Sequence, residues 1–257
     1  MQERRFKVET VTGSTIIMSG RETVHAVRVL RLNVRDEVVL FDGQGREVDG
    51  RIRTVSSSGV EVEVTSEVRL RPIARSALIL AVATPKGPRA DWLVEKCAEL
   101  GVHRLCWLTT RRGIVEPGEG KLSRWRRKAV AAAKQAGQAR VMDIEAPRTI
   151  MELADAVPEK VTVFYGDPDP VGPEGVSHES EVSRSFSEAM VSHASGGVCN
   201  ALVLIGPEGG FTVDERECIL GLGGKPVRLA GSILRIETAA IAAAAIWACT
   251  VLSAGAD

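Results

Sequence analysis

The order of apolar and polar positions changes character near residue 72. Up to that point, short segments with β-propensity follow one another, and residues 60–64 (Val-Glu-Val-Glu-Val) alternate as a half-buried strand does. The predicted elements are strands over residues 5–8, 14–18, 37–41, 47–55 and 60–64, and a short helix over residues 25–31. Because the residue before a proline is restricted to extended backbone, we place a boundary at Pro72 and predict a small β-rich domain over residues 1–72.

From residue 76 onward, strands alternate with helices. The strand candidates are near-continuous apolar runs, typical of strands that are covered on both faces of a parallel sheet: residues 77–83, 105–108, 161–165 and 201–205. The predicted helices cover residues 90–100, 121–138, 150–156, 213–221 and 237–252. This alternation predicts an α/β domain over residues 73–257, with ligands at the carboxyl ends of its strands. The long connection over residues 167–200 predicts an acidic surface excursion with one helix near residues 181–191, disorder being the alternative.

The composition excludes several classes of protein. The 257 residues are 44% hydrophobic and 26% charged with a formal net charge of zero, as in an ordinary globular protein, and only 4% are aromatic, too few to grip nucleic acid mainly by stacking. The five cysteines form no C-x-x-C pair, so we expect no disulfide framework and no metal site, and a cytoplasmic location. The longest apolar run, residues 239–249, is shorter than the roughly 20 residues of a membrane span, and no signal peptide is predicted.

The zero net charge hides a strongly basic segment. Residues 104–140 hold 10 basic and 2 acidic residues, whereas residues 141–218 hold 4 and 15. Within the basic segment, Lys121, Arg124, Arg127 and Lys128 recur at helical spacing, with apolar residues on the opposite face. A basic helix face of this kind predicts contact with the phosphates of a nucleic acid, and a solvated surface is the alternative.

Two segments near the C-terminus carry candidate chemistry. In the first, the strand over residues 201–205 ends in a turn of sequence Gly-Pro-Glu-Gly-Gly (206–210), followed by Thr212 and Glu215 at the spacing of a helix capping box. The glycines would let a ligand approach peptide N–H groups, although a bare strand-to-helix connection has the same composition. In the second, residues 229–240 lead into an alanine-rich helix with Arg235 and Glu237 at its start. Charges in such a buried place indicate a ligand or catalytic role, the alternative being an ion pair between the two.

Together the two segments resemble a known family. Residues 206–210 followed by residues 233–239 (Ile-Leu-Arg-Ile-Glu-Thr-Ala) resemble the C-terminal signature of the RsmE-type family, the 16S ribosomal RNA (uracil-N3)-methyltransferases of the SPOUT superfamily. Residues 95–102 resemble the family's K-x-x-E-L-G-V helix, and residues 125–137 its A-x-x-A-x-x-Q-x-G helix. The resemblance covers nearly the whole chain in order.

This resemblance implies a PUA-like β-barrel domain that helps to hold RNA, followed by a SPOUT α/β methyltransferase domain with a C-terminal trefoil knot. It also implies a homodimer, which the apolar surface of the terminal helix favours as well. The implied activity is methylation of N3 of a uridine in 16S ribosomal RNA of the small subunit, a step of ribosome biogenesis that uses S-adenosyl-L-methionine. The residues implied to bind this cofactor are Leu204, Gly206, Glu208, Gly209, Gly210, Leu229, Ala230, Ile233, Leu234, Glu237 and Thr238.

Methylation at N3 requires removal of the N3 proton or stabilisation of the uracil anion, for which arginine donors are suited. We therefore predict catalytic roles for Arg235, inside the cofactor segment, and for Arg112, which follows a predicted strand. The predicted RNA-binding residues are Arg28, Arg31, Lys86, Lys121, Arg124, Arg127, Lys128, Gln135 and Arg140. Two other hypotheses stay open: a SPOUT enzyme acting on a ribose 2′-hydroxyl or a tRNA base, and a non-catalytic RNA-binding or ribosome-assembly protein.

Overall fold

The structure is a computed structural model of the whole chain. It describes residues 4–56, 59–71, 76–154, 160–166, 185–194 and 200–254. The chain forms two compact units: the first comprises Met1–Ile73 and Val130–Val141, and the second Ala74–Ala129 and Met142–Asp257. Of the predicted connection over residues 167–200, residues 167–184 and 195–199 lie outside the described part.

The first unit is built on a sheet that runs in the order β1-β3-β4-β5-β2, with β6 paired to β4. Only the β1–β3 pair is parallel among these pairings. The strands are β1 (Arg5–Lys7), β2 (Thr15–Met18), β3 (Glu37–Phe41), β4 (Arg46–Val55), β5 (Val60–Val64) and β6 (Arg69–Leu70). The helix predicted over residues 25–31 is instead an α-helix, α1 (Gly20–Val24), that continues as a π-helical segment, η1 (His25–Val29).

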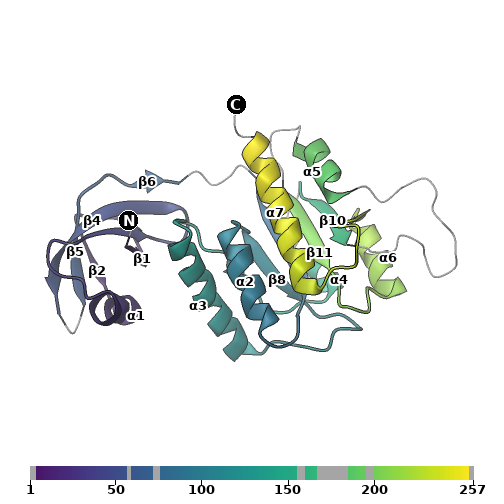
Figure 1. Cartoon of the computed structure of the whole chain (residues 1–257), viewed down its shortest axis with the longest axis horizontal. Helices are drawn as coiled ribbons and strands as arrows, with labels where there is room; N and C mark the ends of the chain where they lie inside the picture. Colours follow the sequence, from purple (N-terminus) through teal and green to yellow (C-terminus); the bar gives the residue numbers. More distant parts are fainter. Residues whose placement is uncertain are drawn as a thin grey trace. The chain divides into compact units, whose positions relative to one another are not determined.

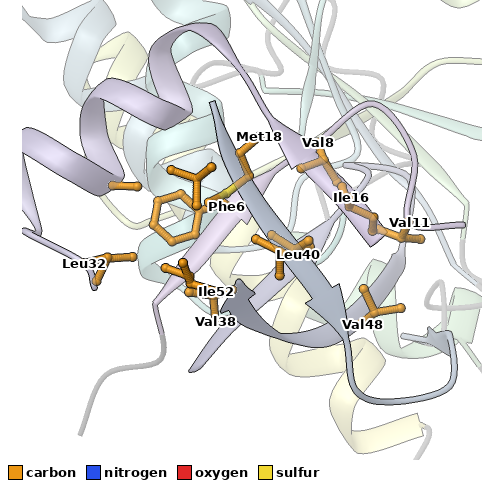
Figure 2. Packing of buried hydrophobic residues seen from close by; sticks show 13 residues of the cluster. Phe6, Val8, Val11, Ile16, Met18, Leu32, Val38, Leu40, Val48 and Ile52 are labelled. Carbon is orange, nitrogen blue, oxygen red and sulfur yellow. The ribbon is translucent and has the colours of Figure 1, made fainter. Parts of the chain in front are cut away.

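Alternation in sequence becomes alternation in burial in this sheet. Val60 and Val62 of β5 are fully buried, whereas Glu61 is half-buried and Glu63 is exposed. Figure 2 shows the apolar cluster on which they pack, in which Phe6 and residues of β2, β3 and β4 meet. Each fully buried aliphatic or aromatic side chain contributes about 1.5–3 kcal/mol relative to an exposed one, so this cluster is what holds the small unit together.

The second unit is an α/β layer structure around a parallel sheet. The strand order is β12-β10-β11-β7-β8-β9, and all the pairings between these strands are parallel. The strands are β7 (Leu78–Ala83), β8 (Arg104–Leu108), β9 (Asp143–Ile144), β10 (Thr162–Gly166), β11 (Ala201–Ile205) and β12 (Lys225–Val227). Strands β9 and β12 were not predicted because they are too short to show a period, and β12 contains Pro226, which an edge strand tolerates.

Helices cover both faces of this sheet. They are α2 (Arg89–Glu99), α3 (Glu119–Gln135), α4 (Ile150–Ala154), α5 (Phe186–Ala194), α6 (Val213–Gly221) and α7 (Ile236–Ala254). Helices α2 and α7 lie side by side over one face (Figure 1), and α7 contacts β7 and β11. On the other face, side chains of α4 and α6 join those of β7, β8, β10 and β11 in one apolar cluster. The predicted α/β architecture of this part is confirmed.

Helix α7 is longer and more apolar than the run found in the sequence. By length and composition alone, its residues 236–253 would suffice to cross a membrane, with a mean hydropathy of 1.7. Core helices of globular domains pass the same test, and α7 packs against α2, α5, β7 and β11. Ala240, Ala243 and Ala244 are fully buried and let it approach the sheet closely.

The tryptophans gather in this second unit. Trp107 of β8 and Trp125 of α3 are buried with their ring centroids 4.4 Å apart, and Trp247 of α7 packs edge-on against His103. The Trp125 Nε1–H donates to Asp91 of α2 at 2.6 Å, which satisfies the polar edge of a buried ring. These contacts tie α2, α3 and β8 together.

Candidate active site

A cavity of about 300 Å³ opens at the carboxyl edge of the parallel sheet. Gly166, Ile205 and Val227, the last residues of β10, β11 and β12, all line it. Because these strands are parallel neighbours, their carboxyl ends meet at one edge, where α/β sheets bind ligands. The volume is at the lower end of the range of small-molecule sites.

Two loops form the remaining walls. One follows β11 and the other links β12 to α7. The predicted cofactor residues that line the cavity are Gly206, Glu208, Gly210, Leu229, Ala230, Ile233 and Leu234. Four others do not line it: Leu204, which is fully buried in the sheet core, Glu237, which is buried in the first turn of α7, and Gly209 and Thr238.

The glycines of the first loop are needed for different reasons. A Cβ on Gly206 would lie 3.1 Å from the Phe211 ring, which forms part of the cavity wall. Gly210 has φ +70°, and its N–H donates to the Pro207 carbonyl at 2.8 Å. The Gly210 N–H therefore closes the turn and is not free to bind a ligand. Gly210 is required by its left-handed backbone.

The second loop has peptide groups to offer. Among the described residues, the N–H groups of residues 230–235 donate to no backbone carbonyl. Most of these residues are exposed, so their N–H groups are open to water or to a ligand with hydrogen-bond acceptors that enters the cavity. Apolar side chains of Ile205, Phe211 and Ile233 complete a surface suited to a flat heterocycle.

Arg235 lines the cavity, and its side chain is exposed. The ion pair between Arg235 and Glu237 that the sequence left open as an alternative is not what the structure contains. Glu237 is 5% exposed and instead pairs with Arg89 of α2, at 3.7 Å between Oε1 and Nη1. The Arg235 guanidinium is thus left to act toward the cavity.

Arg112 lies beside the first loop. Its Nη1 donates to the Gly209 carbonyl at 2.5 Å, and a Cβ on Gly209 would lie 3.2 Å from the Arg112 Cδ. Arg112 does not line the cavity itself. It follows β8, which is separated from β11 by β7, so the two loops meet across the end of the middle strand.

The predicted capping box is present at the start of α6. The Thr212 hydroxyl accepts from the Glu215 N–H, and Glu215 Oε2 accepts from the Thr212 N–H at 2.8 Å. Sequence reasoning missed a further bond: Glu215 Oε1 accepts from the backbone N–H of Arg111 at 2.8 Å. No local pattern could reveal it, because the partners are 104 positions apart.

The basic face of α3 is less positive than the sequence alone indicates. Arg124 pairs with Asp91 at 2.7 Å and Lys128 with Glu95 at 2.8 Å, both from α2. Lys121 and Arg127 are exposed, and no described acidic side chain forms an ion pair with either. Helix α2 therefore supplies carboxylates that neutralise part of this basic face, and the contact of the face with RNA stays a prediction.

The other predicted RNA-binding residues are largely exposed. In the first unit, Arg28 lies on η1, and Arg31 lies two residues beyond its end, with a left-handed φ of +51°. Gln135 ends α3, and Arg140 forms backbone bridges with Gly43 and Gln44. Lys86, in the second unit, is exposed between β7 and α2.

Sequence reasoning also missed several residues of the cavity. Some lie at strand ends or just outside the two motifs, and others lie within the motifs but were not singled out: Gly166, Ile205, Pro207, Phe211, Arg216, Val227, Arg228, Gly231, Ser232, Ile236 and Ala239. Position at the carboxyl end of a strand was the available signal for Gly166 and Ile205. In the described part of the chain, no group of three or more His, Cys, Asp or Glu side chains could hold a metal ion.

Comparison with known families agrees with this geometry. The model of an RNA methyltransferase domain matches residues 73–248, and that of an RNA methyltransferase PUA domain matches residues 19–65. The chain belongs to the RNA methyltransferase family.

Relatives of this RNA methyltransferase span most of its length. It is 29% identical to the ribosomal RNA small subunit methyltransferase E of Bacillus subtilis, over 88% of this chain and 86% of that protein. The S-adenosyl methionine-bound enzyme of the same name from Neisseria gonorrhoeae has the same fold, with a TM-score of 0.77, 24% identity and 95% of each chain covered. A Legionella pneumophila methyltransferase solved with SAM has a TM-score of 0.76 at 25% identity, with 96% of each chain covered.

Proposed function

We propose that this protein transfers a methyl group from S-adenosylmethionine to N3 of a uridine in the ribosomal RNA of the small subunit. The observation that carries the proposal is the cavity at the sheet edge, which combines peptide donors in residues 230–235, apolar walls and the Arg235 guanidinium. Relatives named as small-subunit ribosomal RNA methyltransferases support the choice of substrate, and a similar structure holding SAM supports the cofactor.

The residues of the cavity fit this cofactor. Residues 206–211 and 229–234 would hold it, the adenine between apolar side chains and the polar groups against backbone N–H donors. S-adenosylmethionine, when bound, supplies a sulfonium methyl group that a nucleophile can accept. The chain's own part is to hold the target base in line with that group, which removes most of the entropic cost of bringing two reactants together.

Arg235 is the residue we assign to charge stabilisation. A uracil that loses its N3 proton carries negative charge on its carbonyl oxygens, and a guanidinium offers donors in a planar fork that matches them. Arg112 is assigned a supporting catalytic role through the loop that it anchors. The Arg89–Glu237 pair holds the first turn of α7 and so helps to fix the backbone of Arg235, which directly precedes this helix.

RNA contact is assigned to two surfaces. On α3 it involves Lys121 and Arg127 with Arg124 and Lys128 beside them, and in the first unit it involves Arg28 and Arg31. Lys86, Gln135 and Arg140 complete the proposed set.

We further propose a PUA-like domain over residues 1–72, a knotted SPOUT domain over residues 73–257, a homodimer, no membrane contact and a cytoplasmic location. The small, partly exposed alanines of α7 support the dimer because such residues allow close helix packing.

The decisive experiment compares ribosomal RNA from cells with and without this gene by mass spectrometry. We expect one methylated uridine of the small subunit to lose its methyl group, and purified protein with S-adenosylmethionine to restore it. An unchanged small-subunit RNA would overturn the assignment. A change in tRNA or at a ribose would favour another SPOUT activity.

The melting temperature with and without cofactor distinguishes a methyltransferase from a non-catalytic RNA-binding protein. Binding of S-adenosylmethionine to the folded protein raises the free energy of unfolding, by roughly 2.7 kcal/mol at a cofactor concentration a hundred times the dissociation constant. The melting temperature rises with it. No stabilisation at millimolar cofactor would favour a binding or assembly protein. Light scattering at micromolar concentration tests the dimer, and a monomer mass would contradict it.

A further inference from the structure

Glu215 holds two loops of the site together. Its Oε2 accepts from the Thr212 N–H at 2.8 Å and from the Thr212 hydroxyl at 3.1 Å, within its own helix start. Its Oε1 accepts from the Arg111 N–H at 2.8 Å, in the loop that follows β8. One carboxylate therefore uses its two oxygens for two different loops.

The contact spans the middle of the sheet. Strand β7 lies between β8 and β11, so the loop after β8 reaches the loop after β11 only by passing over the end of β7. The two bonds that make this bridge are Arg111 N–H to Glu215 and Arg112 Nη1 to the Gly209 carbonyl. Gly209 is next to Gly210, which closes the turn at the cavity wall.

A capping role alone does not explain the Oε1 bond. A capping box needs the Thr212 side chain and the Glu215 carboxylate only to satisfy donors at one helix start. The bond to Arg111 adds a partner that is 104 positions away and next to a predicted catalytic residue. Since Arg112 follows Arg111 directly, fixing the Arg111 peptide restricts where the Arg112 side chain starts.

We propose that Glu215 is a positioning residue that fixes the loop carrying Arg112 against the cofactor loop, so that both are in place for methyl transfer. The inference rests on the proposed function. It predicts that loss of the Oε1 bond lowers the rate of the chemical step more than it lowers cofactor affinity, because misplacement of about 1 Å can cost about 10²-fold in rate.

The test variant is Glu215→Gln, with Thr212→Ala and Arg111→Ala as matched controls. A glutamine keeps one acceptor oxygen and replaces the other by an NH₂ donor, so it cannot accept from both loops. Thr212→Ala weakens the helix cap but leaves both carboxylate oxygens in place. Arg111→Ala keeps the backbone N–H, the only group of Arg111 that the bridge uses.

The first readout does not depend on activity. Amide hydrogen exchange should show the Arg111 N–H protected in the parent protein, in Thr212→Ala and in Arg111→Ala, and unprotected in Glu215→Gln. An unprotected Arg111 amide in the parent protein would overturn the proposal.

The second readout is single-turnover methylation in a double-mutant cycle with Arg112→Ala. If Glu215 acts through Arg112, Glu215→Gln should slow turnover about 10- to 100-fold alone and change it less than threefold in the Arg112→Ala background. Calorimetric S-adenosylmethionine affinity should change less than about fivefold throughout. If the rate losses of Glu215→Gln and Arg112→Ala simply multiply in the double variant, or if Glu215→Gln loses rate and cofactor affinity equally, Glu215 has a merely structural role and the proposal is overturned. If the parent protein methylates no ribosomal RNA, the proposed function fails, and the positioning role fails with it, while exchange still reports the contact.

Discussion

Replacing Arg235 by alanine should separate catalysis from stability. The Arg235 side chain is exposed, lines the cavity and, among the described residues, has no ion pair with an acidic side chain. Arg89 is the matched control, because it is the partner of the buried Glu237 carboxylate. Both variants remove one guanidinium from the same edge of the sheet.

The structure gives different magnitudes for the two changes. An exposed substitution away from packed features alters the free energy of unfolding by at most about 0.5 kcal/mol, which for a chain of this size shifts the melting temperature by less than about 2 °C. Arg89→Ala leaves the Glu237 carboxylate buried without its partner, at a cost of about 1–3 kcal/mol or roughly 2–12 °C. Removing one donor from a developing anion slows turnover by about 10²–10³-fold, or roughly 2.7–4 kcal/mol.

Three measurements on each variant test this reasoning. Differential scanning calorimetry gives the melting temperature, titration calorimetry gives the affinity for S-adenosylmethionine, and single-turnover methylation gives the rate. We expect Arg235→Ala to lose rate alone and Arg89→Ala to lose stability. A folded Arg235→Ala protein that methylates at the parent rate would remove Arg235 from the mechanism, and a large fall in its melting temperature would refute its assignment as a free side chain.

Four further predictions follow from contacts in the two units. Gly210→Ala should weaken S-adenosylmethionine binding measured by calorimetry, because an L-residue at φ +70° costs about 1–2 kcal/mol. Gly221 has no positive φ and open space around it, so the control variant Gly221→Ala should bind the cofactor normally. The pair Lys121→Glu and Arg127→Glu should flatten the salt dependence of RNA binding by about two in slope, and an unchanged slope in filter-binding assays would mark this face as solvated surface only. Burial raises the pKa of the Glu47 carboxyl, but hydrogen bonds and charges from Arg5 and Arg71 outweigh this effect and hold the pKa below its ordinary value of 4.5. The stability that this carboxylate contributes is therefore present above pH 4.5 and is lost as the pH falls through the lowered pKa. The melting temperature of Glu47→Gln should depend less on pH in this acid range. Burial raises the pKa of the Cys97 and Cys106 thiols to about 12, so at pH 8 neither should react with a thiol reagent until the protein unfolds, as mass spectrometry of the labelled peptides would show.

The elements that the sequence predicts well are those with a strong local period. Strands β3, β5 and β11 and helix α6 match their predicted bounds, because alternation, a continuous apolar run or a capping box defines each end. Strands β6, β9 and β12 escaped because two or three residues carry no period, and pairing with neighbours is what makes them strands. The α1–η1 junction escaped because no composition rule marks a π-helical segment.

The candidate site shows the same division. The segments over residues 206–210 and 229–240 could be found from the sequence because each leads from a turn into a helix start. Residues of both segments line one cavity. Contacts between distant segments could not be found locally. The Arg89–Glu237 pair joins two helices, the Asp91 and Glu95 carboxylates neutralise a face of α3, and the Arg111–Glu215 bond crosses a strand. In each case the partner is set by packing, and packing depends on the whole sheet.

The placement of the tryptophans makes the two units optically distinct. All 4 tryptophans of the chain, at positions 92, 107, 125 and 247, belong to the second unit, and the first has none. Intrinsic tryptophan emission therefore reports on the methyltransferase unit alone, and the coupled indole pair of Trp107 and Trp125 should add a near-ultraviolet dichroism band that vanishes when β8 separates from α3. Far-ultraviolet dichroism sees both units. If the small β unit melts independently, the two signals will give different transition curves, and the chain will reveal without any label whether it unfolds in one step or two.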